Sequence, residues 1–217
     1  MEILITAYKS QKYINETLNS IPSNISIIIG VDGCEETLNT LLKIKDNFNN
    51  LKILWCPENR GTYITRNTLL KQSNSNVIVF LDSDDIYTKE LFEKIEQNIK
   101  ENDVIRWSYY LLNNGTYSTP PKNVHYYHAN GVFACKKEIF NKLGGYKDWR
   151  YAADYDLQIR INEMGFKTVK LDDNLMVYRQ HQDSLSSTVP INKRVEKERQ
   201  IGGDWVNPVI HKNFSWV

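Results

Sequence analysis

The chain has 217 residues, 41% of them hydrophobic, and its 27 Lys and Arg residues nearly balance 26 Asp and Glu residues. This length suffices for one sizeable α/β core, and the near-neutral charge excludes a general field that would attract nucleic acid or anionic lipid. Three widely spaced cysteines, Cys34, Cys56 and Cys135, argue against a disulfide framework and a paired zinc site. No apolar run is long enough to span a bilayer, and a strand-like segment begins at once, where a signal peptide would lie. We therefore expect a reduced, cytoplasmic protein, which leaves room for a peripheral association with a membrane.

The first half of the chain alternates strand-like and helical segments. Short β-branched runs predict strands over residues 3–6, 25–31, 51–55 and 77–81. Helix-length segments begin near Ser10, Glu35 and Thr62. This alternation predicts a mostly parallel sheet with helices on both faces, an architecture that by analogy binds nucleotides.

The second half of the chain has a different pattern. A predicted helix over residues 89–99 precedes a strand over 104–112, and Asn113, Asn114 and Gly115 then indicate a turn before a tyrosine-rich stretch, which predicts antiparallel strands. Further helices are predicted over 136–143 and 153–164, each ended by glycine, followed by two strands near Lys167 and Leu175. The tail from Ser184 is polar and contains a charged helical stretch at 192–200, which we expect to be mobile or to pack on a partner.

The strongest chemical signal is the acidic cluster in the segment VIVFLDSDD, residues 77–85. In an extended chain Asp82 and Asp84 point to one side and Ser83 to the other, so two carboxylates can share one cation. Because Mg²⁺ and Mn²⁺ prefer carboxylate and phosphate oxygens, the cluster predicts a diphosphate ligand held through Mn²⁺ or Mg²⁺ at the carboxyl end of the sheet. The alternative is an acidic loop in which Asp85 or Thr88 caps the next helix.

A second acidic pair begins the helix predicted over residues 153–164. Asp154 and Asp156 are two residues apart, about 200° around a helix, so they cannot address one site. Asp156 lies four residues before Arg160, the spacing of an exposed ion pair, and we expect it to be structural. Asp154 is the better candidate for catalysis, with a helix cap as the alternative, because it starts an inward-facing stripe that continues through Leu157, Ile161 and Met164.

Seven segments in order resemble family 2 glycosyltransferases of the GT-A fold: ITAYKSQKYINETLNSI, IIIGVDGCEETL, NRGTYITRNTLL, FLDSDD, LGGYKD, ADYDLQIRI and YRQHQDSLS. The resemblance implies an α/β fold with a single Rossmann-like catalytic domain over residues 1–186, a mostly parallel sheet and a small antiparallel layer. Residues 187–217 would form a C-terminal tail with a charged helix. The implied activity is inverting transfer of a sugar from a nucleoside-diphosphate donor, which we expect to be a UDP-sugar, to a hydroxyl of a glycan or other acceptor.

The resemblance also implies roles for individual residues. Asp154 would be the general base that takes the proton of the acceptor hydroxyl, and a divalent metal would offset charge on the departing diphosphate. His181 would approach the metal or the diphosphate, next to Asp82 and Asp84. The remaining donor-site residues are expected near the carboxyl ends of the strands, with one on the helix that begins near Thr62. They are Thr6, Ala7, Tyr8, Asp32, Arg66 and Ser83.

Two positions depart from the family pattern, since Val31 stands where many relatives carry an acidic residue, and Ala153 replaces an acidic neighbour of Asp154. Trp149 and Tyr151 are candidates for stacking on an acceptor sugar, or for core packing. For the other candidates, ordinary structural roles also remain open: a simple Asp-Gly turn at Asp32, a solvated Arg66, and packing roles for Tyr8 and His181.

The sequence is also compatible with two other functions. A phosphatase of the haloacid dehalogenase type would use Asp82 as nucleophile, with Asp172 and Asp173 as a distal acidic pair. That class, however, places its nucleophile after the first strand, whereas three strand-like segments precede Asp82 here. A module that binds sugar nucleotides or glycans would keep the acidic cluster without catalysing a reaction.

Overall fold

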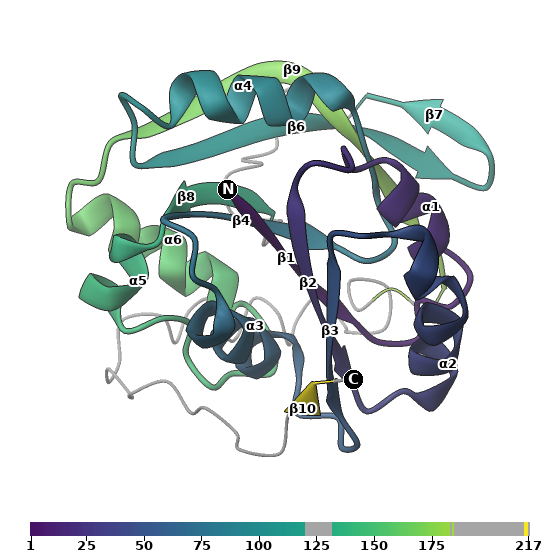
Figure 1. The fold of residues 1–217 in the computed structure, drawn as a ribbon. Coiled ribbons are helices and arrows are strands. Elements are labelled where there is room, and N and C mark those ends of the chain that lie inside the picture. Colours follow the sequence, from purple (N-terminus) through teal and green to yellow (C-terminus); the bar gives the residue numbers. More distant parts are fainter. Residues whose placement is uncertain (120–131, 183, 185–214, 217) are drawn as a thin grey trace.

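The computed structural model describes residues 1–119, 132–182, 184 and 215–216. The strands form one ten-stranded sheet in the order β10-β3-β2-β1-β4-β8-β6-β9-β5, with β7 paired to β6 (Figure 1). Its parallel half consists of β1 (Glu2–Ala7), β2 (Ser26–Asp32), β3 (Leu51–Cys56) and β4 (Val77–Asp82). The four strands predicted from β-branched runs are confirmed, each boundary lying within one residue of the expected one.

Helices cover both faces of this sheet. α1 (Ile14–Asn19), α2 (Glu35–Ile44) and α4 (Lys89–Asn98) contribute apolar residues to one core cluster, whereas α3 (Thr62–Gln72), α5 (Glu138–Leu143) and α6 (Ala153–Glu163) contribute to the other. Alternate residues of β1 enter opposite clusters, Ile3 and Ile5 on one side and Leu4 on the other, as expected for a strand buried on both faces. The doubly covered sheet is therefore confirmed.

α3 lies unusually close to the sheet. A Cβ atom placed on Gly30 of β2 would lie 2.6 Å from the Cγ2 atom of Thr65 on α3. Since that distance is below any ordinary contact, a glycine at this position allows the helix to approach the strand. The approach brings the side chains of α3 to the carboxyl edge of the parallel strands.

The antiparallel strands continue the same sheet. β8 (Phe133–Lys136) pairs with β4 and with β6 (Val104–Asn113), while β9 (Thr168–Gln180) runs parallel to β6 and antiparallel to β5 (Ile86–Tyr87). The predicted turn after β6 is confirmed: Asn114 and Gly115, with φ of 47° and 79°, connect β6 to β7 (Thr116–Ser118) in a hairpin.

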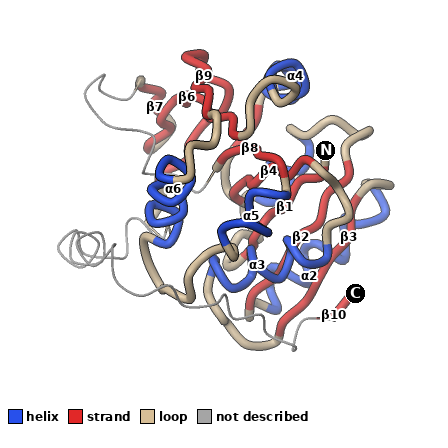
Figure 2. Tube along the Cα trace, turned by 90° about the vertical axis from the view of Figure 1, so that its left-hand side faces the viewer, coloured by secondary structure: helices blue, strands red, loops and turns tan. Residues whose placement is uncertain are grey.

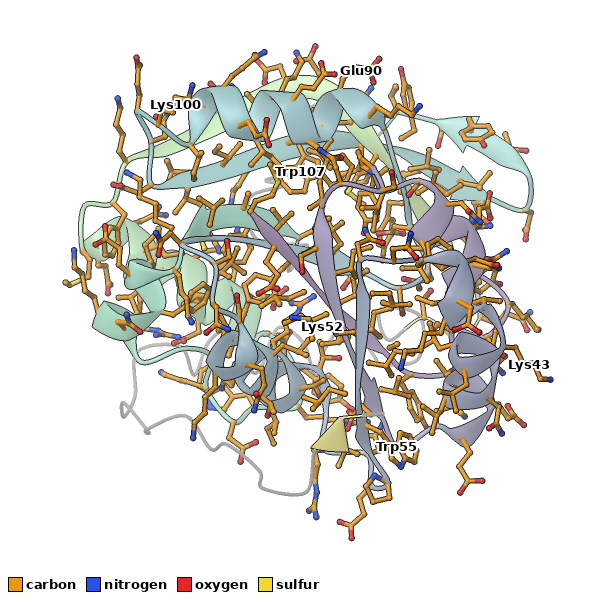
Figure 3. All side chains as sticks on the ribbon, viewed as in Figure 1. Lys43, Lys52, Trp55, Glu90, Lys100 and Trp107 are labelled. Carbon is orange, nitrogen blue, oxygen red and sulfur yellow. The ribbon has the colours of Figure 1, made fainter. Side chains whose placement is uncertain are left out.

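α4 packs along this antiparallel half, as the two views show (Figure 1, Figure 2). Trp107 of β6 is buried and lies beneath the helix, whereas the exposed Glu90 lies on its outer side and the exposed Lys100 lies just beyond its C-terminal end (Figure 3). The charged and apolar faces of α4 are thus separated as its amphipathic sequence predicts.

Three expectations about the second half of the chain need correction. The two strands predicted near Lys167 and Leu175 are one strand, β9, because register shifts opposite Trp107 to Tyr109 absorb the polar residues in its middle. α5 begins at Glu138, since Lys136 belongs to β8. Met164 is 57% exposed, so the inward stripe of α6 ends at Ile161.

Several predictions fall outside the described residues, namely the end of the tyrosine-rich stretch, the domain boundary at residue 186 and the charged stretch at 192–200. From the end of the tail, β10 (Ser215–Trp216) is described, and it pairs antiparallel with β3 at the edge of the sheet. Within the described ranges, no helix has the length and hydropathy needed to cross a membrane. A short 3₁₀ helix, η1 (Lys45–Asn47), follows α2.

Candidate active site

The carboxyl ends of the parallel strands align at one edge of the sheet. Thr6 of β1 is paired with Gly30 of β2 and with Asp82 of β4, and Ala7 is paired with Val31. Ala7 is buried, Thr6 is half-buried, and Tyr8, just beyond the strand, is 46% exposed. The residues expected to contact a nucleoside from β1 therefore lie at the same edge as the acidic cluster.

Asp32, at the end of β2, holds the loop that leads into α3. Its two carboxylate oxygens accept hydrogen bonds from the backbone N–H groups of Arg60 and Gly61, at 2.7 and 2.8 Å. Burial raises the pKa of Asp32, although these two hydrogen bonds oppose the shift. The neighbouring Gly33 has φ of 71°, and a Cβ atom there would lie 2.3 Å from the backbone nitrogen of Asn59. Asp32 thus does more than form a turn, and its contact with a nucleoside stays a prediction.

Arg66 of α3 is buried and forms an ion pair with Asp82. Its guanidinium nitrogen lies 2.7 Å from the Asp82 carboxylate, above the rings of Phe80 and Tyr146. Burial lowers the pKa of the Arg66 guanidinium and is the largest single effect, but Asp82 and the other nearby acidic groups together outweigh it, so the pKa is raised. The alternative of a solvated surface position for Arg66 is excluded. The structure places this side chain against Asp82, and its predicted contact with a nucleotide would have to involve the remaining nitrogens.

Asp82 lies among three other charges. Burial raises the pKa of its carboxyl group, Arg66 lowers it, and the nearby Asp84 and Asp154 raise it further. The hydroxyl of Tyr87 accepts a hydrogen bond from the Asp82 backbone nitrogen and donates one to its carbonyl oxygen. The position of Asp82 is therefore fixed through both its backbone and its side chain.

Asp84 is paired with His181 rather than with Arg66. The Asp84 Oδ2 and His181 Nε2 atoms are 2.9 Å apart, and the imidazole packs against Tyr13 with ring centroids 4.7 Å apart. β4 ends at Asp82, and residues 83–84 form a turn, so the expectation that the two carboxylates share a face of an extended strand does not apply. The two carboxylates instead have separate partners.

The turn formed by residues 83–84 is held in place by hydrogen bonds from α1 and β9. The Thr17 hydroxyl lies within hydrogen-bonding distance of the carbonyl oxygens of Ser83 and Asp85, at 3.1 and 2.8 Å. Arg179 of β9 donates from its backbone nitrogen to the Asp85 carboxylate and from Nε to the Asp84 carbonyl. Ser83 itself is buried.

The helix-capping alternative is confirmed only for the position of Thr88 and is wrong for Asp85. Asp85 is fully buried, and burial, followed by the charges of Asp84 and Asp82, raises its pKa well above the usual range. Thr88 is the N-cap residue of α4 but makes no capping hydrogen bond through its side chain. Asp85 therefore supports the turn, not the helix.

Asp154 approaches the same edge from α6. It is half-buried in the first turn of the helix, two residues after the N-cap residue Ala152, whose φ is 59°. The hydroxyl of Tyr63 on α3 donates a hydrogen bond to Asp154 Oδ1 over 2.7 Å. Asp154 thus faces the acidic cluster, and its side chain is engaged by another element instead of capping its own helix, which shows no side-chain cap.

Asp156 is buried, in contrast to the exposed position that its spacing indicated. Its two oxygens pair with Lys147 at 2.8 Å and with Arg160 at 2.6 Å. Arg160 also donates to the carbonyl oxygens of Leu143 and Gly145. This cluster ties α6 to the turn after α5, which is a structural role.

The two candidate acceptor residues lie in the loop before α6. Trp149 is half-buried against the core, and the Lys147 ammonium lies 4.7 Å from its ring centroid. Tyr151 is also half-buried. Both rings lie close to Asp154 in sequence, and their stacking on an acceptor remains a prediction.

Tyr63 and Arg179 were not identified from the sequence. Nothing in a tyrosine inside a helical segment indicates that it reaches a carboxylate 91 residues away. Arg179 could have been found, because it lies two residues before His181, and in an extended chain alternate residues share a side.

Together, these features define an α/β protein whose acidic residues lie at the carboxyl ends of its parallel strands, the edge where sheets of this kind bind ligands. A family model described as Glycosyl transferase family 2 matches residues 2–154. The chain therefore belongs to glycosyl transferase family 2, and the resemblance drawn from its seven segments is confirmed.

Known proteins resemble the chain over most of its length. The Escherichia coli enzyme named UDP-Glc:alpha-D-GlcNAc-diphosphoundecaprenol beta-1,3-glucosyltransferase WfaP is 29% identical over 221 residues, covering 92% of this chain and 83% of WfaP. The crystal structure of residues 1–349 of Staphylococcus aureus TarS in complex with UDP-GlcNAc has a TM-score of 0.76 at 21% identity, covering 92% of this chain and 64% of that one. The mannosyltransferase PcManGT from Pyrobaculum calidifontis, in complex with GDP-Man and Mn²⁺, has a TM-score of 0.66 at 15% identity, covering 82% and 56%.

These structural matches confirm the expected fold. The chain spans less than two thirds of the length of several relatives that it matches and of both solved structures. The phosphatase alternative is excluded by the family, and its distal acidic pair is not built into a site: Asp172 and Asp173 are exposed and pair with Lys170 and Lys94.

Proposed function

We propose that this chain is an inverting glycosyltransferase that moves a sugar from a UDP-sugar to a hydroxyl of a glycan or similar acceptor. The observation that carries the proposal is that α3 contacts two carboxylates at the carboxyl edge of the sheet, next to Asp84: its Arg66 pairs with Asp82 at 2.7 Å, and its Tyr63 donates to Asp154 over 2.7 Å. Three carboxylates gathered at a ligand-binding edge suit a reaction that needs a cation and a base.

A UDP-linked donor is supported by two relatives. WfaP is named for UDP-Glc, and the TarS structure contains UDP-GlcNAc. In this chain the donor would lie along the ends of β1 and β2, where Thr6, Ala7 and Tyr8 border the edge and Asp32 shapes the adjoining loop. Backbone groups and short side chains at this edge suit a flat base and ribose.

The residues present fit a divalent metal. Two neighbouring ligands of a six-coordinate ion, each about 2.1 Å from it, are about 3 Å apart, and Asp84 Oδ2 and His181 Nε2 are 2.9 Å apart. Within the described part of the chain, no cluster of three or more metal-binding side chains occurs, so diphosphate oxygens would have to complete the coordination. Mn²⁺ or Mg²⁺ held by Asp84 and His181 would offset the charge of the departing diphosphate.

Asp82 would serve this site differently from Asp84. Because Arg66 already engages one Asp82 oxygen, we assign Asp82 to positioning the donor edge and, through its second oxygen, to a supporting contact with the metal or the sugar. Ser83 between them contributes its backbone to the turn.

Asp154 is the residue we assign to the acceptor. Its carboxylate would take the proton of the acceptor hydroxyl as that oxygen bonds to the anomeric carbon, with inversion of configuration. Trp149 and Tyr151, in the loop leading to α6, would stack on the acceptor sugar.

A donor screen tests the proposal. The full chain is incubated with UDP-, GDP- and dTDP-linked sugars and Mn²⁺, and the release of nucleoside diphosphate is measured with and without chelator. We expect slow hydrolysis of a UDP-sugar that chelator suppresses. Metal-dependent binding without release of UDP for any sugar or acceptor offered would instead indicate a non-catalytic sugar-nucleotide module.

A further inference from the structure

One helix connects the two acidic sides of the site. On α3, Arg66 pairs with Asp82, and Tyr63, almost one turn earlier, donates its hydroxyl proton to Asp154 Oδ1 over 2.7 Å. Tyr63 is 7% exposed, so water cannot readily replace it as the partner of Asp154. A hydrogen bond from a buried phenol to a carboxylate is short, directional and stronger than a bond between neutral groups.

We propose that Tyr63 is a positioning residue for Asp154: its hydroxyl holds one carboxylate oxygen and leaves the other to receive the proton of the acceptor hydroxyl. This inference rests on the proposed function, in which Asp154 is the base. Because a general base works only within hydrogen-bonding reach of the proton that it removes, fixing the carboxylate in one orientation increases the rate of transfer.

The surroundings of Tyr63 keep its phenol in place. Its ring is stacked on Tyr146, with centroids 5.5 Å apart and 28° between the planes. Tyr146 is in turn fixed by Asn67 of α3, whose side-chain amide donates to the Tyr146 carbonyl and accepts from its backbone nitrogen. The donor therefore belongs to a rigid part of the core and is not a side chain that adjusts to Asp154.

The phenol also stays protonated. Burial, and then the charge of Asp154, raises the pKa of Tyr63 well above its usual value, so Tyr63 remains a donor throughout the neutral range. The other charged groups that reach this region are Arg66 and Asp82. Arg66 and Asp82 largely neutralise each other through their ion pair, and Tyr63 contacts the carboxylate directly.

The test is the variant Tyr63→Phe in the full chain, which keeps the ring and removes the hydroxyl. We expect kcat to fall about tenfold or more, while KM for the donor stays within about twofold. A hydrogen bond to the charged form of a carboxylate favours that form, so its loss should move the acidic limb of the pH–rate profile to higher pH. A merely structural role of Tyr63 would not move that limb.

Tyr146→Phe is the matched control. It removes a hydroxyl from the same aromatic cluster and keeps the ring, and that hydroxyl finds no hydrogen-bond partner among the described residues. We expect kcat and the acidic limb to match the unmodified chain. If Tyr63→Phe does not fold, fluorotyrosine at position 63 keeps the ring and strengthens the donor, and an unchanged acidic limb would then overturn the inference.

A double-mutant cycle separates this inference from the proposed function. In an Asp154→Asn background, Tyr63→Phe should cause no further loss, because its effect acts through the carboxylate. Full activity of Asp154→Asn would overturn the assignment of the base. Two outcomes would overturn only the role of Tyr63. In the first, Asp154→Asn is inactive but Tyr63→Phe keeps full activity. In the second, Asp154→Asn is inactive and the two losses add in the double variant.

Discussion

Arg66 on α3 and Asp82 at the end of β4 form an ion pair with 2.7 Å between nitrogen and oxygen, in which the arginine side chain is only 4% exposed. Since Asp82 is paired in the sheet with Thr6, this contact locks α3 to the edge where the donor is proposed to bind. The ion pair is therefore expected to contribute to stability as well as to the site.

Replacing Arg66 by Ala should lower the free energy of unfolding by about 2 to 4 kcal/mol, less than for a fully buried pair because the Asp82 side chain is 30% exposed. The loss includes the packing of the guanidinium on Phe80 and Tyr146. Urea denaturation measures it. Arg150→Ala is the control, since that exposed arginine bonds only to exposed Asn59 among the contacts described, and we expect a change within about 0.5 kcal/mol. Equal losses for both variants would contradict the prediction.

Replacing Asp84 by Ala should abolish metal-dependent binding of UDP. The variant removes one of the two side chains that fit the metal, so the diphosphate would lose the cation that bridges it to the protein. Calorimetric titration of UDP with Mn²⁺, repeated with chelator, measures the effect. Asp173→Ala removes an exposed carboxylate paired with Lys94 and should leave binding unchanged. UDP binding of equal strength with and without metal in the unmodified chain would rule the metal site out.

Asp154 and Asp156 should respond differently to the same conservative change. Asp154→Asn should retain donor binding and the melting temperature but lose transfer by about 10²- to 10⁴-fold, as expected for a general base. Asp156→Asn leaves buried Lys147 and Arg160 with reduced compensation and should destabilise the fold by about 3 kcal/mol or more. Transfer assays and thermal melts of both variants distinguish the two roles, and a stable, inactive Asp156→Asn would reverse the assignment.

The pair formed by Asp103 and Lys136 should make stability depend on pH. The Lys136 hydrogen bond is the main reason that the pKa of Asp103 is lowered, and the Lys167 backbone nitrogen donates to its other oxygen. A carboxyl group with a lowered folded pKa stabilises the fold above its unfolded pKa, and this contribution disappears as the pH falls through the folded value.

Asp103→Asn should therefore cost about 0.5 to 1.5 kcal/mol at neutral pH, a small value because both side chains are partly exposed. The difference in unfolding free energy between this variant and the unmodified chain should narrow as the pH falls below 3.8, the pKa of the carboxyl group in the unfolded chain. Denaturation curves at several pH values measure this difference. Asp172→Asn, at a carboxylate that is 95% exposed, serves as the control and should show no such difference. A difference that is constant with pH would mean that the hydrogen bonds survive without the charge.

The sequence by itself determined the parallel half of the sheet, most helices and the position of the acidic cluster. These features are local: β-branched runs, helical periodicity and the apolar strand before Asp82 each leave a pattern within about ten residues. The Asn114-Gly115 hairpin was likewise predictable, because a two-residue turn needs positive φ at both positions. The order of seven segments was enough to identify the family.

Only the tertiary structure decided which side chains meet. The partners Tyr63 and Asp154 are 91 residues apart, and Asp84 and His181 are 97 apart, and no local periodicity encodes such pairs. The same limit explains the errors: Asp156 has the spacing of an exposed ion pair, yet the packing of α6 buries it with Lys147. Contacts between elements depend on how closely α3 and α6 pack against the sheet and on which strands pair with β9, and both are set by the whole core.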